Sequence, residues 1–168
     1  MAESLADDQG TSGTVSGAGN EREFCLRMPY IKDLSFEAPY TLGPFENDGR
    51  EPEISLNLRT SSRDLGKNMR EVVLHVDVHA LSGERTVFLL ELAQAGRFEI
   101  SGFSKEELRA LIGVACPTAL FPYAREAVSS MVQRGGFPAV LLRPIDFAAL
   151  FSEAQANRAD RAPPAGQA

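Results

Sequence analysis

Hydrophobic side chains in the first half of the chain recur at every second position, the spacing expected of strands with one buried face. The first such stretch covers residues 24–36, and the proline at position 29 predicts an edge strand or a bulge there. A second, shorter stretch covers residues 54–58. The side chains expected to face inward are Phe24, Leu26, Met28, Tyr30, Leu34 and Phe36 in the first stretch, and Ile54, Leu56 and Leu58 in the second.

Two further alternating stretches predict a hairpin. They cover residues 69–81 and 86–94 and flank a Ser-Gly-Glu turn at residues 82–84. In the second of them the even-numbered apolar side chains are expected to face inward, whereas Leu89 and Glu91 face outward. Together the four stretches predict a four-stranded antiparallel meander, in which each strand pairs with the next along the chain.

Beyond the fourth strand the hydrophobic period lengthens to about 3.6, which predicts helices. Ser104 and Glu107 have the spacing of a capping box at the start of the first helix, and Pro117 is expected to end that helix. A second helix is expected to begin at Pro122, and a short third helix is expected near residues 147–151. A sheet followed by helices indicates the α+β class.

The segment between the first two predicted helices is unusually apolar for a connection. Residues 116–126 read CPTALFPYARE, and the two prolines predict a stiff, non-helical connector. Leaving its leucine and aromatic side chains in water costs about 25 cal/mol per Å² of apolar surface. We therefore expect this connector either to fold into the core or to receive an apolar partner.

The two ends of the chain differ in composition from its centre. Residues 1–22 are rich in Gly, Ser, Thr and acidic side chains and are expected to be a disordered tail. Residues 152–168 are rich in Ala and polar side chains and are expected to be a mobile C-terminal tail. One domain over residues 23–151 remains.

Charge and cysteine content narrow the choice of partners and compartment. The net charge of −6 and the pI near 5.0 argue against nucleic acid or an anionic membrane as the main partner. Cys25 and Cys116 lack metal-ligand spacing, which indicates free thiols in a reducing compartment. We find neither a run long enough to span a membrane nor the pattern of a signal peptide, and therefore expect a cytoplasmic protein.

Candidate chemistry is sparse. The glycine-rich phosphate and dinucleotide motifs and the Gly-x-Ser-x-Gly motif of hydrolases do not occur. His75, Asp77 and His79 project from one face of a predicted strand, but the two histidines lie roughly 13 Å apart there, too far to share one metal ion. We expect no metal site. We interpret these three residues as part of a polar face of the strand that is exposed to solvent.

A group of carboxylates shares the outward parity of the first and fourth strands. It consists of Asp33, Glu37 and Glu91, with the apolar Leu89 among them. Without an evident cavity, acid–base catalysis is a poor explanation. Two interpretations remain open, a solvated face and a docking patch for a basic, partly apolar partner.

The aromatic side chains also allow two interpretations. Any one of Phe36, Phe98, Phe121, Tyr123, Phe147 and Phe151 is most simply a core residue. However, some of them lie in the predicted connector and the last helix, where a deep core is unusual. An apolar groove between mobile loops would bind extended, unfolded segments with little sequence preference.

Several blocks of the sequence resemble the SecB family of bacterial protein-export chaperones. They are YIKDLSFEAP at residues 30–39, EVVL at 71–74, FLLE at 88–91, CPTALFPYARE at 116–126 and MVQRG at 131–135, together with Phe147-x-x-Leu150-Phe151. The resemblance extends over most of the chain between the two tails. It implies a four-stranded antiparallel sheet with helices on one side, and assembly into a homotetramer that is a dimer of dimers.

The resemblance also implies a function. SecB-like proteins are ATP-independent holdases that bind non-native precursor proteins and deliver them to the translocation ATPase SecA; they are not enzymes and need no cofactor. The client-binding groove would be lined by Ile54, Leu56, Leu58, Phe98, Phe121, Tyr123 and Phe151. The SecA-docking face would consist of Asp33, Glu37, Leu89 and Glu91 and would bind the basic, zinc-bearing tail of SecA.

Two alternatives stay open beside the export role. The same fold serves chaperones dedicated to one client, such as the antitoxin of a toxin–antitoxin pair. A small ligand-binding enzyme on an α+β sheet is the alternative from a different class, because a fold alone does not fix chemistry.

Overall fold

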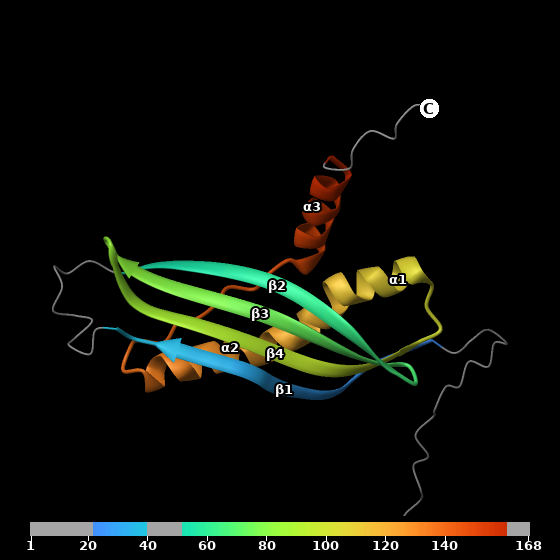
Figure 1. Ribbon diagram of the computed structural model, residues 1–168, viewed down its shortest axis with the longest axis horizontal. Helices are drawn as coiled ribbons and strands as arrows, with labels where there is room; N and C mark the ends of the chain where they lie inside the picture. The colour runs from blue at the N-terminus through green and yellow to red at the C-terminus, as the bar shows by residue number, and fades with distance from the viewer. Residues whose placement is uncertain (1–21, 40–51, 161–168) are drawn as a thin grey trace, which may run out of the picture.

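The computed structural model of the protein describes residues 22–39 and 52–160, the last three of them by their backbone alone (Figure 1). The strands are β1 (Glu23–Glu37), β2 (Glu53–Gly66), β3 (Met69–Ser82) and β4 (Arg85–Ser101). The helices are α1 (Lys105–Ala110), the π-helix η1 (Leu111–Ala115), α2 (Cys116–Arg134) and α3 (Phe147–Asp160). This arrangement confirms the α+β class. Residues 1–21 of the predicted N-terminal tail lie outside the described residues, and the predicted domain boundary at residue 151 falls inside α3.

The strands pair antiparallel throughout, but the prediction of a meander is wrong. Their order across the sheet is β1-β4-β3-β2, so that β1 lies beside β4 and not beside β2 (Figure 1). In this position Leu34 and Phe36 of β1 are opposite Leu92 and Leu90 of β4 and join the main core. Residues 38–52 separate β1 from β2 in the sequence, and closing a loop of that length adds little entropic cost over a shorter one.

Two tight turns hold the hairpins on either side of β3. Lys67 and Asn68 link β2 to β3 with φ values of 50° and 61°, the left-handed geometry of a two-residue hairpin turn. The predicted turn between β3 and β4 is confirmed, and Gly83 there has a φ of 60°.

Strand β1 carries two bulges that change which side chains face inward. The pairing with β4 skips one residue at Arg27 and another at Lys32. A bulge inserts one extra residue and so reverses the alternation of faces beyond it. The single inward parity predicted for residues 24–36 is therefore wrong for Met28 and Tyr30, which lie between the bulges and are opposite Arg97 and Ala95. The expectation of an edge strand or bulge near the proline is confirmed.

The helical region is continuous from residue 105 to residue 134, which corrects the predicted break. Pro117 lies in the first turn of α2 and Pro122 lies inside it, so the expected stiff connector is helical. The backbone N–H of Cys116 bonds to the carbonyl of Leu111, five residues back, as in a π-helix. Such a wide turn makes room for a proline ring where a regular α-helix has none. The capping box of Ser104 and Glu107 is confirmed.

Helix α2 covers one side of the sheet, which we call the helix face; we call the other side the open face (Figure 1). The buried stripe of α2 includes Leu120, Ala124, Val128 and Val132, which pack against the apolar residues of β3 and β4. Gly96 of β4 allows close approach, since a Cβ there would lie 2.7 Å from Leu120 Cδ2 and 2.8 Å from Leu26 Cδ1. None of the helices in the described residues is long and apolar enough to cross a membrane.

Candidate functional site

The residues predicted for SecA docking all lie on the open face. In the register of β1 against β4, Glu37 is opposite Leu89, Ser35 is opposite Glu91, and Asp33 is opposite Ala93. Because alternate residues of a strand share a face, Asp33, Glu37, Leu89 and Glu91 form one contiguous surface across two neighbouring strands. The carboxylates are exposed and Leu89 is half-buried.

These three carboxylates differ from most acidic side chains elsewhere on the strands. Asp33, Glu37 and Glu91 form no ion pair with any described residue. By contrast, Asp64 lies 2.7 Å from an Arg70 nitrogen, and Glu23 and Glu99 both bind Arg27. An exposed cluster of unpaired carboxylates around a leucine retains its full charge for a cationic, partly apolar partner.

A buried carboxylate lies in the neighbouring part of the open face. The Glu71 side chain on β3 is only 6 % exposed, and it receives the Lys32 ammonium at 2.6 Å and an Arg63 nitrogen at 3.3 Å. It also accepts a hydrogen bond from the Tyr30 hydroxyl. The hydrogen bonds from Lys32 and Tyr30 hold the pKa of Glu71 below its ordinary value, while burial and the bond to Glu71 raise the pKa of Tyr30.

The polar side chains that alternate along β3 contact different residues of β2 and do not converge on one site. Ser61 and His75 lie 3.1 Å apart between Oγ and Nε2, and Asn57 donates to Asp77 at 3.1 Å. Burial lowers the pKa of His75, and the nearby Arg59 charge acts in the same direction. Within the described residues no three His, Cys, Asp or Glu side chains converge in a way that would hold a metal ion.

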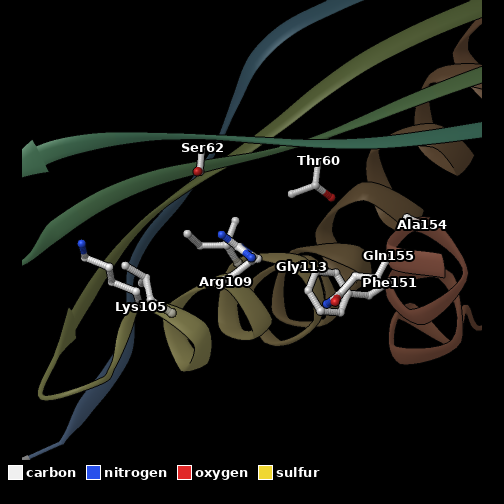
Figure 2. Close-up of a pocket in the computed structure, with 10 residues that line it drawn as sticks. Thr60, Ser62, Lys105, Arg109, Gly113, Phe151, Ala154 and Gln155 are labelled. Atoms are coloured by element: carbon white, nitrogen blue, oxygen red, sulfur yellow. The ribbon is translucent and has the colours of Figure 1, made fainter. Parts of the chain in front are cut away.

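The helix face has a groove beside β2, where the helices leave the strand uncovered. Its volume is about 530 Å³, and it opens between β2 and the α1–η1 segment, with α3 at one end (Figure 2). It is lined by Thr60, Ser62, Lys105, Leu108, Arg109, Ile112, Gly113, Phe151, Ala154 and Gln155. We call this the β2 groove.

Four of the predicted client-binding residues belong to this side of the molecule. Ile54, Leu56 and Leu58 precede the lining residues on the same face of β2, and Ile54 is 42 % exposed. Phe151 of α3 lies across the groove, where its ring covers Gly113 of η1 (Figure 2). Of the four, Phe151 lines the groove, whereas Ile54, Leu56 and Leu58 lie on the same face of β2 outside its lining.

The remaining three predicted client-binding residues, Phe98, Phe121 and Tyr123, also lie outside the lining of the β2 groove. Phe98 has no exposed surface and stacks on Phe24, with ring centroids 5.7 Å apart. Phe121 is buried and makes an edge contact with Phe147 at 5.6 Å. In this chain both are core residues: Phe98 lies beneath α2, and Phe121 is a buried residue of α2 itself. Tyr123 is 46 % exposed, but it lies near β1 at the opposite edge of the sheet.

Tyr123 lines a second apolar groove, of about 390 Å³, between α2 and β1. Pro29, Tyr30, Ile31, Gln94, Pro122, Glu126 and Ala127 form the rest of its lining. We call this the β1 groove. The sequence analysis missed Ile31, which is half-exposed and faces inward only because the bulges shift the register. Pro29 was the one signal of that irregularity.

Comparison with known proteins identifies relatives over most of the chain. A family model described as "Preprotein translocase subunit SecB" matches residues 17–158. "Protein-export protein SecB" of Nitrosococcus oceani is 40% identical over 155 residues, which cover 92% of this chain and 94% of that protein. "Protein-export protein SecB" of Methylococcus capsulatus is 43% identical over 145 residues, 86% of this chain and 93% of that protein.

A solved structure shares the fold. A Mycobacterium tuberculosis SecB-like chaperone, determined in complex with a peptide from an antitoxin, superposes with a TM-score of 0.62 and 16% sequence identity. The match covers 73% of this chain and 90% of that one. At this identity the likeness extends to the fold alone.

Proposed function

Because the chain belongs to the SecB family of protein-export chaperones, we propose that it is an ATP-independent holdase that binds unfolded precursors on its helix face and delivers them to SecA from its open face. Members of this family are chaperones and not enzymes. The observation that carries the proposal is the separation of the apolar grooves from the unpaired carboxylates by the thickness of the sheet.

The apolar grooves support the role in client binding. The β2 groove continues an exposed strand whose helix-face side chains include Ile54 and Leu56, and among the described residues β2 is an edge strand with no partner strand on its outer side. An extended client would cover the apolar side chains and could also bond to that edge. Such contacts need little sequence specificity, and binding the unfolded state withdraws it from aggregation.

The open-face carboxylates support the role in docking. Asp33, Glu37 and Glu91 have no cationic partner among the described residues, and Leu89 adds apolar surface between them. A basic segment such as the zinc-bearing tail of SecA has the complementary charge. Any zinc would belong to that partner.

Assembly into a homotetramer, a dimer of dimers, is part of the proposal. Neither α1 nor η1 has a buried residue: Leu108 and Leu111 pack against the core but stay partly exposed, and Ile112 is partly exposed beside the β2 groove. Helices of this kind gain stability when a second layer covers them. We place the assembled protein in the cytoplasm, where precursors are bound before export.

The test is a comparison of variants on the two faces. Glu91→Lys and Asp33→Lys should weaken SecA binding by about tenfold or more, measured by titration calorimetry, because they reverse the charge of the docking surface. The same variants should still suppress aggregation of an unfolded precursor. Tyr123→Ala combined with Phe151→Ala should show the reverse pattern, with Leu150→Ala as a matched control on an exposed position of α3. Equal loss of both activities in every variant would contradict the proposal.

A further inference from the structure

Both bulges of β1 share a feature that the rest of the strand lacks. The extra residue in each is a cation bound to a carboxylate on another strand. Arg27 donates two bonds to Glu99 of β4, at 2.8 Å from Nε and 2.6 Å from Nη2. Lys32 donates one bond to Glu71 of β3, at 2.6 Å from Nζ. Each ion pair therefore ties a bulged residue to a fixed point of the sheet.

The Lys32–Glu71 contact is the more constrained of the two. The Glu71 carboxylate is almost fully buried, whereas the Glu99 side chain is 29% exposed. Glu71 also receives an Arg63 nitrogen at 3.3 Å, but loss of the closer Lys32 ammonium leaves the buried carboxylate with less compensation, which is more costly than losing an exposed pair. The second bulge therefore has a strong reason to keep Lys32 over Glu71, two strands away from β1.

The position of this bulge determines how the docking residues are presented. Asp33 follows Lys32 directly, and from there Asp33, Ser35 and Glu37 face the open side while Leu34 and Phe36 face the core. Packing of Phe36 against Phe88 and Phe137 selects the face. This packing does not determine at which residue of β1 the bulge occurs. The position of the bulge decides whether Asp33 is opposite Ala93 on the open face.

The ion pair also controls a charge. Without Glu71, the Lys32 ammonium would be free beside Asp33, where it would neutralise the carboxylate or repel a basic partner. Bound to Glu71, it is held at the register of Arg97 on β4, whereas Asp33 is opposite Ala93. The same contact thus fixes the geometry of the docking surface and removes a competing cation from it.

We propose that Lys32 and Glu71 are positioning residues for the open-face docking surface: their contact holds the second bulge of β1 so that Asp33, Glu37, Leu89 and Glu91 present one surface to the partner. The inference rests on the proposed function, since it assumes that this surface binds SecA. Neither residue needs to touch SecA itself.

The decisive variant is Lys32→Met, because electrostatics and positioning predict opposite signs. Removing a cation makes the open face more negative, so simple attraction would tighten binding of a basic partner. Positioning predicts at least about fivefold weaker binding of purified SecA in titration calorimetry, with unchanged suppression of precursor aggregation. Lys32→Arg, which can still reach Glu71, should restore the affinity.

Three controls separate the possible outcomes. Glu71→Gln should weaken SecA binding more than Glu99→Gln, which makes the same change of charge at the first bulge, away from Asp33. Unchanged or tighter binding by Lys32→Met would overturn the inference, as would a parallel loss of SecA binding and client capture.

If Glu91→Lys also leaves SecA binding intact, the docking assignment itself is wrong. Lys32→Gln serves the same purpose should Lys32→Met fail to fold.

Discussion

The two cysteines show how strongly position decides the chemistry of a single residue. Cys116 is fully buried at the start of α2, and burial raises the pKa of its thiol to about 12. The reactive species is the thiolate, which such a pKa suppresses. Cys25 lies on the edge strand β1 and is partly exposed.

We predict that an alkylating reagent at mildly alkaline pH labels Cys25 and spares Cys116 while the protein is folded. Peptide mass spectrometry gives the site of labelling directly. In the control variant Cys25→Ser, the folded protein should take up no label and the unfolded protein one. Labelling of Cys116 at a rate similar to that of Cys25 under native conditions would show that the start of α2 is open to solvent.

At the scale of single residues, the sequence predicts that the protein has an acidic surface and an apolar one more reliably than it predicts which residues form each of them. The carboxylates proposed for docking were grouped because strand alternation places them on one face, and the structure keeps them on one face despite two bulges. The aromatic residues were harder to assign. Strand alternation places Phe98 on the helix face, where a side chain can belong either to the core or to a groove. Only the packing of α2 over it makes Phe98 a core residue.

At the scale of elements, α3 depends on few contacts with the rest of the protein. It projects away from the sheet (Figure 1), and its contact with η1 is made where the Phe151 ring covers Gly113. A Cβ at position 113 would lie 2.3 Å from the ring, so only glycine permits this contact. At its start α3 is also anchored by the buried Phe147, which contacts Phe121 of α2. Beyond that first turn, the α3 end of the β2 groove depends on the Phe151 ring.

We predict that Phe151→Ala loosens α3 beyond its first turn, which the buried Phe147 still anchors, without loosening the sheet. Loss of a half-buried ring should cost about 1–2 kcal/mol of docking free energy. Amide hydrogen exchange in α3 should then be roughly 5 to 30 times faster, whereas β3 and β4 keep their protection. Gly113→Val should act in the same way by displacing the ring.

The neighbouring Leu150→Ala provides the matched control, since Leu150 is exposed on the same helix. It should leave exchange in α3 unchanged. Equal acceleration by Leu150→Ala and Phe151→Ala would mean that the helix is held by something other than the Gly113 contact.

The predicted boundaries of helices and strands were wrong where tertiary packing outweighed the local preferences of the sequence. Pro117 and Pro122 each predict a helix boundary, yet the π-helical turn and the burial of Leu120 and Phe121 make one continuous helical segment more favourable. Strand β4 also runs seven residues past its predicted end at residue 94, because Phe98 and Ile100 remain in the core.

For the whole molecule, the α+β class followed from local periodicity, whereas the order of the strands did not. Strand β1 could pair with β2 or with β4, and the alternation of apolar and polar residues in β1 fits either partner. What decides it is the burial of Leu34 and Phe36 against β4 and the residues that follow α2. The part of the chain that the structure describes has apolar grooves at both edges of its helix face, and on its open face carboxylates with no ion-pair partner within that part.

The central claim is that this molecule captures unfolded chains without an energy source. Light scattering of a refolding, aggregation-prone precursor, with and without the protein in nucleotide-free buffer, tests it most directly. We predict that stoichiometric protein suppresses the scattering, and that Glu91→Lys suppresses it equally well because that change lies on the open face. Undiminished scattering in the presence of folded, assembled protein would contradict the claim.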